Sequence, residues 1–571
     1  MEFSPAPPAR IQNAASWPRF SKALGNVQLI RIVRKSRTAA LALLWIVWLV
    51  PPVAAAPTRS PTPAVISSED LASDTLNRLA VRRFGALSAA ELKLVRAASH
   101  RELPWLGPSD DPDAPANDVA HGEQWGPERT VRAEIIRWLI ADAEASRLVH
   151  SSGLAMGGAR IAGALDLSYT NFDKPITILS CYEPDKIDLR SAHLVEFIVR
   201  RSNTGPVPAD SLNIAGDLSF IMGKYGSMSF FRARIHGNFD LTGARVMESG
   251  QDTVNLVEAT VGGDAVFQDG FTTDGTVDVR LAKIGHDLSF HGVAFTGAGD
   301  NGLNAERVIF DGTFYWTDIQ HTKKTVLDLE DAHAGAIWDD EASWPAPGNL
   351  VVSGFVYNEI AGGPSEAADR LRWLGLQSPG YRPQPYRQLA KVLTDNGREN
   401  GATEVRIAKE IALRHFGHLS PLQRAWSILL QVTIGFGYRP LRALWWIGGF
   451  VILGTVLFGW GYRSGLITPT DERAYQAFVK TAEAPPHYPS FNPFVYSLEN
   501  FLPVVVLYQD QYWRPNARHN IRGRVRRATD PLDADSIPSR LLRAYLWLHI
   551  LAGWMITPLL FAGLSGLVRP D

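Results

Sequence analysis

The middle of the chain alternates apolar and polar residues in short segments that recur along the sequence. Five segments share two apolar positions separated by one residue, and the third residue after the second of them is Ala or Val. The segments begin at Met228, Val254, Val277, Leu303 and Leu327. Their starts are 26, 23, 26 and 24 residues apart, and looser copies lie at 159–167, 192–198 and 214–220. Alternation with a period of two predicts strands that bury one face. A repeat of this length predicts units that stack on one another to bury those faces.

This repeat predicts a β-solenoid over residues 151–362, with about seven or eight coils and a height of about 35 Å at ~4.8 Å per stacked strand. Its units follow the pattern A-x-I-x-G-x-L-x-L, which resembles degenerate pentapeptide-repeat β-helices. We therefore expect a right-handed coil. Small residues such as Ala233, Ala259 and Ala282 are expected where the coil turns tightly.

Helices are predicted on both sides of the solenoid. Residues 67–150 are expected to form a helical cap over its first end, because 70–95 and 128–145 carry apolar residues at helical spacing. Residues 363–440 are expected to form a helical connector with a hairpin closed by Asn396-Gly397. The predicted fold class is therefore mixed: a pentapeptide-like β-solenoid with helical flanks and apolar C-terminal helices.

Three apolar stretches predict membrane segments, and they cover residues 39–56, 443–462 and 544–568. The first lies in an N-terminal segment, residues 1–66, between a basic region and a Pro-rich linker, and is typical of either a cleaved signal or an uncleaved anchor. The other two predict transmembrane helices, since twenty residues rise about 30 Å. Residues 491–508 are apolar but contain two prolines and a glutamate, which favours a re-entrant or interfacial segment. Together these parts predict a membrane domain over 441–571.

The loop before the last apolar stretch is strongly basic. It carries six arginines with no intervening acid: Arg514, Arg518, Arg522, Arg524, Arg526 and Arg527. We expect this loop to face the cytoplasm and to contact anionic lipids. The prediction is a multi-pass protein of a bacterial inner membrane whose solenoid lies outside the cytoplasm. A moderately basic stretch before residue 443 favours the opposite orientation.

The composition limits the kinds of binding or catalytic site that the chain can form. The 571 residues include 57 basic and 58 acidic side chains, but residues 157–340 alone carry 15 basic and 26 acidic ones. Cys181 is the single cysteine, so an intrachain disulfide and a cysteine-based metal site are excluded. The arginine-rich loop lacks interleaved aromatic residues, so a nucleic-acid partner is not expected.

An acidic column is the main candidate site. One outward position in four successive units is occupied by Asp217, Asn238, Asp264 and Asp287. Stacking would place these side chains about 5 Å apart, where like charges repel. The column predicts either a binding face for a divalent cation, a basic protein or a glycan, or a solvated face that keeps the protein soluble. Asp217, Asp264 and Asp287 are the candidate metal ligands.

Other motifs favour structural interpretations. Residues 297–302 match GxGxxG, but strand-like residues follow, so we expect a loop between coils rather than a dinucleotide site. Thr433–Gly437 is close to a potassium-channel filter, yet a turn leading into an apolar helix is favoured. An acidic cluster near Trp338 and Trp344 could supply the general acid and base of a polysaccharide-active enzyme. Alternation turns Asp328 and Glu330 outward, so a solvated surface is favoured for the cluster. Its members are Asp328, Glu330, Asp331, His333, Asp339, Asp340 and Glu341.

From Trp125 onward the chain resembles an uncharacterised group of bacterial membrane proteins that are often labelled "membrane-associated oxidoreductase". Four motifs carry the resemblance: Trp125, Gly126 and Arg129; Gly158–Ile161 with Gly163; Gly435–Pro440; and Tyr496–Val505 with Gln509 and Trp513. The resemblance implies the architecture and brings no catalytic residues with it.

The sequence therefore predicts a membrane-anchored solenoid that acts as a scaffold or binding protein, with no cofactor and no catalytic residue assigned. A channel-like protein built from oligomerised C-terminal segments is the first alternative. A membrane-associated oxidoreductase is the second.

Overall fold

The computed structural model of the chain describes residues 68–109, 111, 114–247, 252–297, 301–481, 483–516 and 537–567. The contacts divide the chain into two units, Met1–Val65 and Ile66–Asp571. All described residues belong to the second unit. The predicted signal or anchor segment at 39–56 lies outside them.

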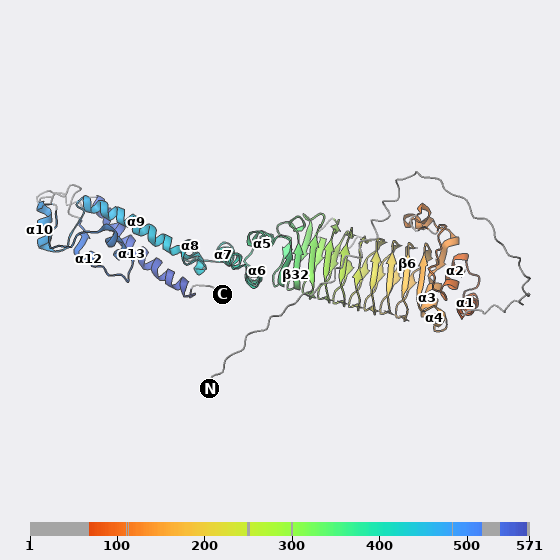
Figure 1. The fold of residues 1–571 in the computed structure, drawn as a ribbon. Helices are drawn as coiled ribbons and strands as arrows, with labels where there is room; N and C mark the ends of the chain where they lie inside the picture. The colour runs from red at the N-terminus through yellow and green to blue at the C-terminus, as the bar shows by residue number, and fades with distance from the viewer. Residues whose placement is uncertain are drawn as a thin grey trace, which may run out of the picture. The chain divides into compact units, whose positions relative to one another are not determined.

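A β-solenoid of about nine turns forms the middle of the chain, as predicted, and Figure 1 shows its coils stacked from β6 (Ile176–Leu179) to β32 (His333–Asp339). The stack exceeds the predicted seven or eight coils. The repeat pattern missed the coil that begins at Leu350. In this coil the buried Phe355 occupies the position where the five regular segments carry Ala or Val.

The coils build three parallel sheets that run along the solenoid. The largest, here called face A, contains β2 (Leu154–Gly157), β5 (Asn171–Phe172), β6, β9 (His193–Leu194), β10 (Phe197–Arg200), β13 (Asn213–Ile214), β14 (Leu218–Ile221), β17 (Arg234–Ile235), β18 (Phe239–Asp240), β21 (Thr260–Val261), β22 (Ala265–Gln268), β25 (Lys283–Ile284), β26 (Leu288–His291), β29 (Ile309–Phe310), β30 (Thr313–Thr317), β32 and β34 (Val356–Gly362). Face B contains β1 (Thr130–Arg132), β3 (Arg160–Ala162), β7 (Tyr182–Glu183), β11 (Asn203–Thr204), β15 (Lys224–Tyr225), β19 (Arg245–Val246), β23 (Thr272–Thr273) and β27 (Ala294–Phe295). Face C contains β12 (Val207–Pro208), β16 (Met228–Ser229), β20 (Asp252–Asn255), β24 (Thr276–Asp278), β28 (Asn301–Asn304), β31 (Thr325–Asp328) and β33 (Leu350–Val351), and the pair β4 (Leu165–Asp166) and β8 (Ile187–Asp188) precedes it.

The strand register steps by one coil at a time. Phe197 pairs with Ile176 and with Leu218, and Leu218 pairs with Phe239, so these coils are 21 residues long. The next step, from Phe239 to Ala265, is 26 residues. Inward-facing residues of these strands form a continuous apolar core in which Phe rings follow one another along the coil axis. Each coil therefore buries its apolar face against its neighbours.

One corner of the coil has a recurrent structure. Asp278 Oδ1 accepts the N–H of Arg280 at 3.0 Å, and the following residue, Leu281, has a φ of 58°. The same bond, again three residues before a positive-φ residue, is made by Asp166, Asp188, Asn255, Asn304 and Asp328. Asp and Asn side chains stabilise such turns. Part of the acidic excess of the solenoid therefore shapes its corners.

Helices cover the first end of the solenoid: α1 (Ser68–Phe84), α2 (Ala89–Ala97), α3 (Ala133–Ala141) and α4 (Ala145–Leu148), with 3₁₀ turns η1 (Pro115–Asn117), η2 (Val119–Gln124) and η3 (Pro127–Arg129). The helical pattern over 70–95 is interrupted at Gly85, which has a φ of 75°, and restarts at a capping box formed by Ser88 and Glu91. The helix expected from residue 128 begins at Ala133 as α3, because the preceding strand β1 pairs with β3 of face B.

Two of the sequence motifs meet where the cap joins the solenoid. The buried Arg129 guanidinium lies 3.5 Å from the centre of the Trp125 ring, and its Nε donates to the carbonyl oxygen of Gly158 at 2.8 Å. The aromatic ring and the carbonyl compensate the buried charge. This contact fixes the cap to the first coils.

The connector follows the last coil and contains α5 (Ala367–Leu374), α6 (Pro383–Asp395), α7 (Glu399–Phe416) and α8 (Pro421–Ile434). The predicted hairpin is present as α6 and α7, and Gly397 between them has a φ of 73°. A further 3₁₀ turn, η4 (Glu341–Ser343), follows β32 in the chain and contacts β30.

The C-terminal part contains two helices that are long and apolar enough to cross a membrane, α9 (Arg442–Arg463) and α13 (Ile537–Leu564). Most of their apolar residues are not buried by the rest of the chain, unlike those of a soluble core helix. The half-length helix α11 (Pro493–Phe501) contacts both of them. The remaining elements are η5 (Gly435–Gly437), α10 (Glu472–Thr481), α12 (Gln509–Tyr512), and the antiparallel pair β35 (Ile467–Pro469) and β36 (Trp513–Pro515).

Candidate binding groove on the solenoid

The predicted acidic column lies on face A, and each of its side chains bonds to the backbone of the next coil. Asp217 Oδ1 accepts the N–H of Asn238 at 2.7 Å, and Asn238 Oδ1 accepts that of Asp264 at 2.9 Å. Asp264 accepts the N–H of Asp287 at 3.0 Å, and Asp287 accepts that of Thr313 at 2.7 Å. The column is therefore a ladder that satisfies one backbone donor in each coil.

The ladder requires a residue without a side chain beside most of its rungs. A Cβ at Gly237, Gly263 or Gly312 would lie 2.2 to 2.4 Å from the side-chain oxygen of the preceding rung. His286 takes this position in the remaining coil, and its Nδ1 lies 4.0 Å from Asp264 Oδ1. The glycines that mark the repeat are thus explained by close contact with the ladder.

The ladder uses one oxygen of each carboxylate. Within the described ranges, no three His, Cys, Asp or Glu side chains gather closely enough to hold a metal ion. The metal role of Asp217, Asp264 and Asp287 stays a prediction, and the backbone bonds account for these residues without it.

A groove of about 440 Å³ lies on face A beside the ladder. Along its floor the outward positions pair from coil to coil: Val266 with Ser289, Ser289 with Tyr315, and Tyr315 with Trp338. Two small side chains precede two large rings in this column, so the surface rises in a step at Tyr315. Besides Ser289 and Tyr315, the polar residues that line the groove are Asp264, Asp287, Gln268, His291 and Thr317.

The two rings at the step support each other. The Tyr315 and Trp338 ring centres are 5.8 Å apart, with planes inclined by 32°, and Trp338 is 46% exposed. A Cβ on Gly362 would come within 2.4 Å of the Trp338 ring, so that ring lies directly against the backbone of the next coil. On the groove itself, Thr317 Oγ1 lies 2.9 Å from His291 Nδ1. Fixed rings beside polar groups suit a ligand with both apolar faces and hydroxyl groups.

The acid cluster around Trp338 divides into different structural roles. Asp339, expected among surface residues, is buried and bonds to Arg370 of α5 through both of its oxygens, at 2.5 and 2.8 Å. Asp340 accepts the backbone N–H groups of Asp318 and Ser343. Asp339 therefore fastens the last coils to the connector, whereas Asp340 stabilises the turn that follows β32.

The two motif matches also have structural roles. The GxGxxG match continues into strand β28 rather than a helix. In the filter-like segment, Thr433 and Ile434 end α8, and Gly435–Gly437 form the buried turn η5, in which all three residues have positive φ. Both observations agree with the structural interpretations of these motifs.

The basic loop is described only at its start. Arg514 is an exposed residue of β36 and pairs in register with Thr468 of β35. Arg518, Arg522, Arg524, Arg526 and Arg527 lie outside the described residues. Cys181 is buried among apolar residues, its thiol lies 3.3 Å from the carbonyl oxygen of Leu179, and burial raises its pKa to about 12. A nucleophilic role for this thiol is therefore disfavoured.

Comparison with family models, with curated proteins and with solved structures finds no match to this chain. The class of protein is therefore defined by its own geometry: a β-solenoid with helices at both ends and two apolar helices near the C-terminus.

Proposed function

We propose that this protein is a membrane-anchored β-solenoid that binds a neutral or amino-sugar glycan in the groove on face A without transforming it. The observation that carries the proposal is the step at Tyr315, where an aromatic pair on a rigid sheet meets hydrogen-bonding side chains. Parallel strands tied coil to coil hold these groups in place, so little ordering entropy is lost on binding.

The charge of the groove selects among glycans. Asp264 and Asp287 each use one oxygen in the ladder, and the other can accept a sugar hydroxyl or an ammonium group. The same carboxylates disfavour uronic acids and other acidic sugars, because like charges repel. Aromatic rings favour the apolar face of a pyranose.

The anchor in this proposal is formed by α9 and α13, with α11 as a re-entrant segment between them. We place the solenoid outside the cytoplasm of a bacterial inner membrane and the arginine-rich loop against anionic lipids on the other side. The coil is taken as right-handed and pentapeptide-like. A glycan of the cell envelope is then within reach of the groove.

Removal of one ring tests the function. In the full chain purified in detergent, Tyr315→Ala should weaken binding of an N-acetylglucosamine oligomer by about tenfold, because the groove loses the ring at its step. Titration calorimetry measures the dissociation constant. Tyr169→Ala is the matched control, since Tyr169 is an 82% exposed tyrosine in an early coil outside the groove. Equal affinity of wild type and both variants, or no binding by wild type, would refute the proposal.

A channel-like conduit is a second candidate, and the packing of α11 favours it. This half-length helix contacts α9 and α13, and the buried Glu499 accepts the N–H groups of Leu507, Gln509 and Asp510. Those bonds hold the segment after α11 in a fixed loop, as a conduit lining requires. Ion flux into liposomes containing the purified protein supports this candidate, and tight liposomes argue against it.

A further inference from the structure

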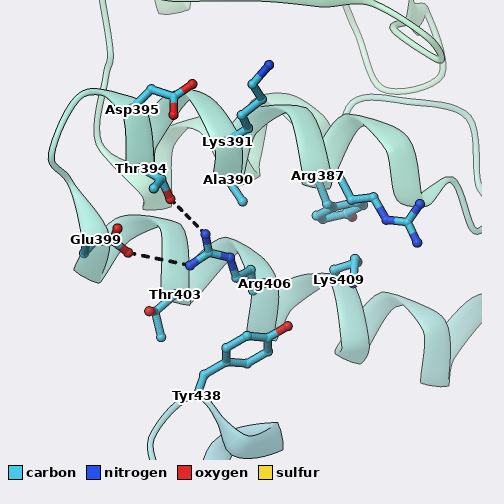
Figure 2. A pocket seen from close by; sticks show the side chains of 11 residues that line it. Arg387, Ala390, Lys391, Thr394, Asp395, Glu399, Thr403, Arg406, Lys409 and Tyr438 are labelled. Atoms are coloured by element: carbon cyan, nitrogen blue, oxygen red, sulfur yellow. Dashed lines mark hydrogen bonds and ion pairs between the residues drawn. The ribbon is translucent and has the colours of Figure 1, made fainter. Parts of the chain in front are cut away.

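The connector contains a second cavity, of about 660 Å³, between α6, α7 and the turn that carries Tyr438 (Figure 2). Its lining includes four cationic side chains and two carboxylates: Arg387, Lys391, Arg406, Lys409, Asp395 and Glu399. The cavity therefore has an excess of positive charge, although the solenoid beside it is acidic. An anion that enters this space gains from that excess.

Two of the cations are held in place by the protein. Arg406 Nη2 donates to Thr394 Oγ1 at 2.8 Å, and Nη1 lies 3.7 Å from a carboxylate oxygen of Glu399. Figure 2 shows this guanidinium between α6 and the ring of Tyr438. The Lys409 side chain is only 6% exposed, and its Nζ lies 3.4 Å from Glu410. A guanidinium fixed at two points is preorganised for a planar or tetrahedral oxyanion.

One wall of the cavity is formed by the segment that leads into the apolar helix α9. Tyr438 lies four residues before α9 begins at Arg442. Helix α8, which leads into the same turn, exposes Leu422, Trp426, Ile428 and Val432. An apolar helix face beside a cationic cavity is the arrangement expected where acyl chains and their head groups meet a protein.

We propose that this cavity binds a phosphate ester, with the head group of an anionic phospholipid as its source. Arg406 and Lys409 supply the charge, and the hydroxyl groups of Tyr438 and Thr403 line the same space. The lipid source rests on the proposed membrane attachment, whereas the phosphate chemistry rests only on the cavity. Ligand binding here would couple the hairpin of α6 and α7 to the turn that precedes α9.

The test is native mass spectrometry of the full chain in detergent, titrated with phosphatidylglycerol, with phosphatidylcholine and with soluble glycerol phosphate. We expect phosphatidylglycerol to bind at least about tenfold more tightly than phosphatidylcholine, and Arg406→Gln to remove that preference. Tyr438→Phe keeps the ring and should cause a smaller loss, of about threefold. Arg424→Gln removes an exposed charge of α8 outside the cavity and should change binding by less than about twofold.

The outcomes distinguish a phospholipid head group from a soluble phosphate ester as the ligand. Phosphatidylglycerol binding that depends on Arg406 supports the lipid source. Arg406-dependent binding of glycerol phosphate without a lipid preference supports the phosphate site and contradicts the lipid source. Equal losses for Arg406→Gln and Arg424→Gln, or no binding of either phosphate ester, would overturn the proposal. Glycan binding by Arg406→Gln should equal that of wild type, so failure here is distinguishable from failure of the groove.

Discussion

Arg370→Met should lower the free energy of unfolding by about 3–5 kcal/mol, because it leaves a buried carboxylate without its counterion. The side chains of Arg370 and Asp339 are 1% and 3% exposed, and two short hydrogen bonds join them. Trp344 Nε1 donates to the same carboxylate at 2.9 Å, which cannot replace a full positive charge. Because Asp339 ends β32 and Arg370 lies in α5, the loss falls where the solenoid joins the connector.

Arg372→Met is the matched control. Arg372 lies two residues further along α5, is 56% exposed, and pairs with Glu341 and Asp369 at the surface. A surface pair of this kind contributes about 0–1 kcal/mol. Thermal unfolding of the full chain, followed by circular dichroism, measures both variants. Equal melting temperatures for the two would contradict the assigned role, and a double variant, Asp339→Leu with Arg370→Met, should recover part of the stability.

A second large effect is expected from pH. Glu183, on β7, is fully buried, and burial raises the pKa of its carboxyl from 4.5 to about 7, with the nearby charge of Asp185 adding to the increase. The folded chain therefore keeps a proton that the unfolded chain releases. Stability is highest below pH 4.5 as far as this group is concerned, and it falls as the pH rises through about 7. The gap between the two pKa values corresponds to about 3 kcal/mol.

Glu183→Gln isolates this contribution. The amide cannot ionise, so the variant should lose the fall in stability between pH 4.5 and 7 and should be more stable than wild type above pH 7. Chemical unfolding at a series of pH values measures the difference. Glu330→Gln, which removes an exposed carboxylate from a later coil, controls for the change in net charge. A wild-type curve that stays parallel to the Glu183→Gln curve would show that Glu183 is ionised in the fold.

The solenoid could be predicted because the residues that produce it lie close together in the sequence of each coil. Every regular coil must bury the same alternating positions, so the apolar pattern survives in the sequence even where coil lengths differ. The helical hairpin was predictable for the same reason, since Asn396-Gly397 sets a stop between two apolar faces. The break at Gly85 was missed because apolar spacing continues on both sides of it.

The groove could not be predicted, because it depends on which residues of different coils become neighbours. Alternation alone places Tyr315 on the outside of its strand. Its position between Ser289 and Trp338 requires the register, and the coils here differ in length by three residues, 26 against 23. The acidic column was found, but its partners are backbone N–H groups, which no side-chain pattern reveals. Asp339 was misassigned because its partner, Arg370, belongs to the connector.

The equal 21-residue coils determine how the distance between the cap and the groove can change. Residues 197–217 and 218–238 occupy equivalent positions, and each coil contacts mainly the coils before and after it. Excision of one such coil would rejoin the ladder and the aromatic core in register, and would bring the groove nearer to the cap by one strand spacing, about 4.8 Å. The distance between cap and groove therefore changes in steps of one strand spacing, and the number of coils sets how far from the cap the groove lies.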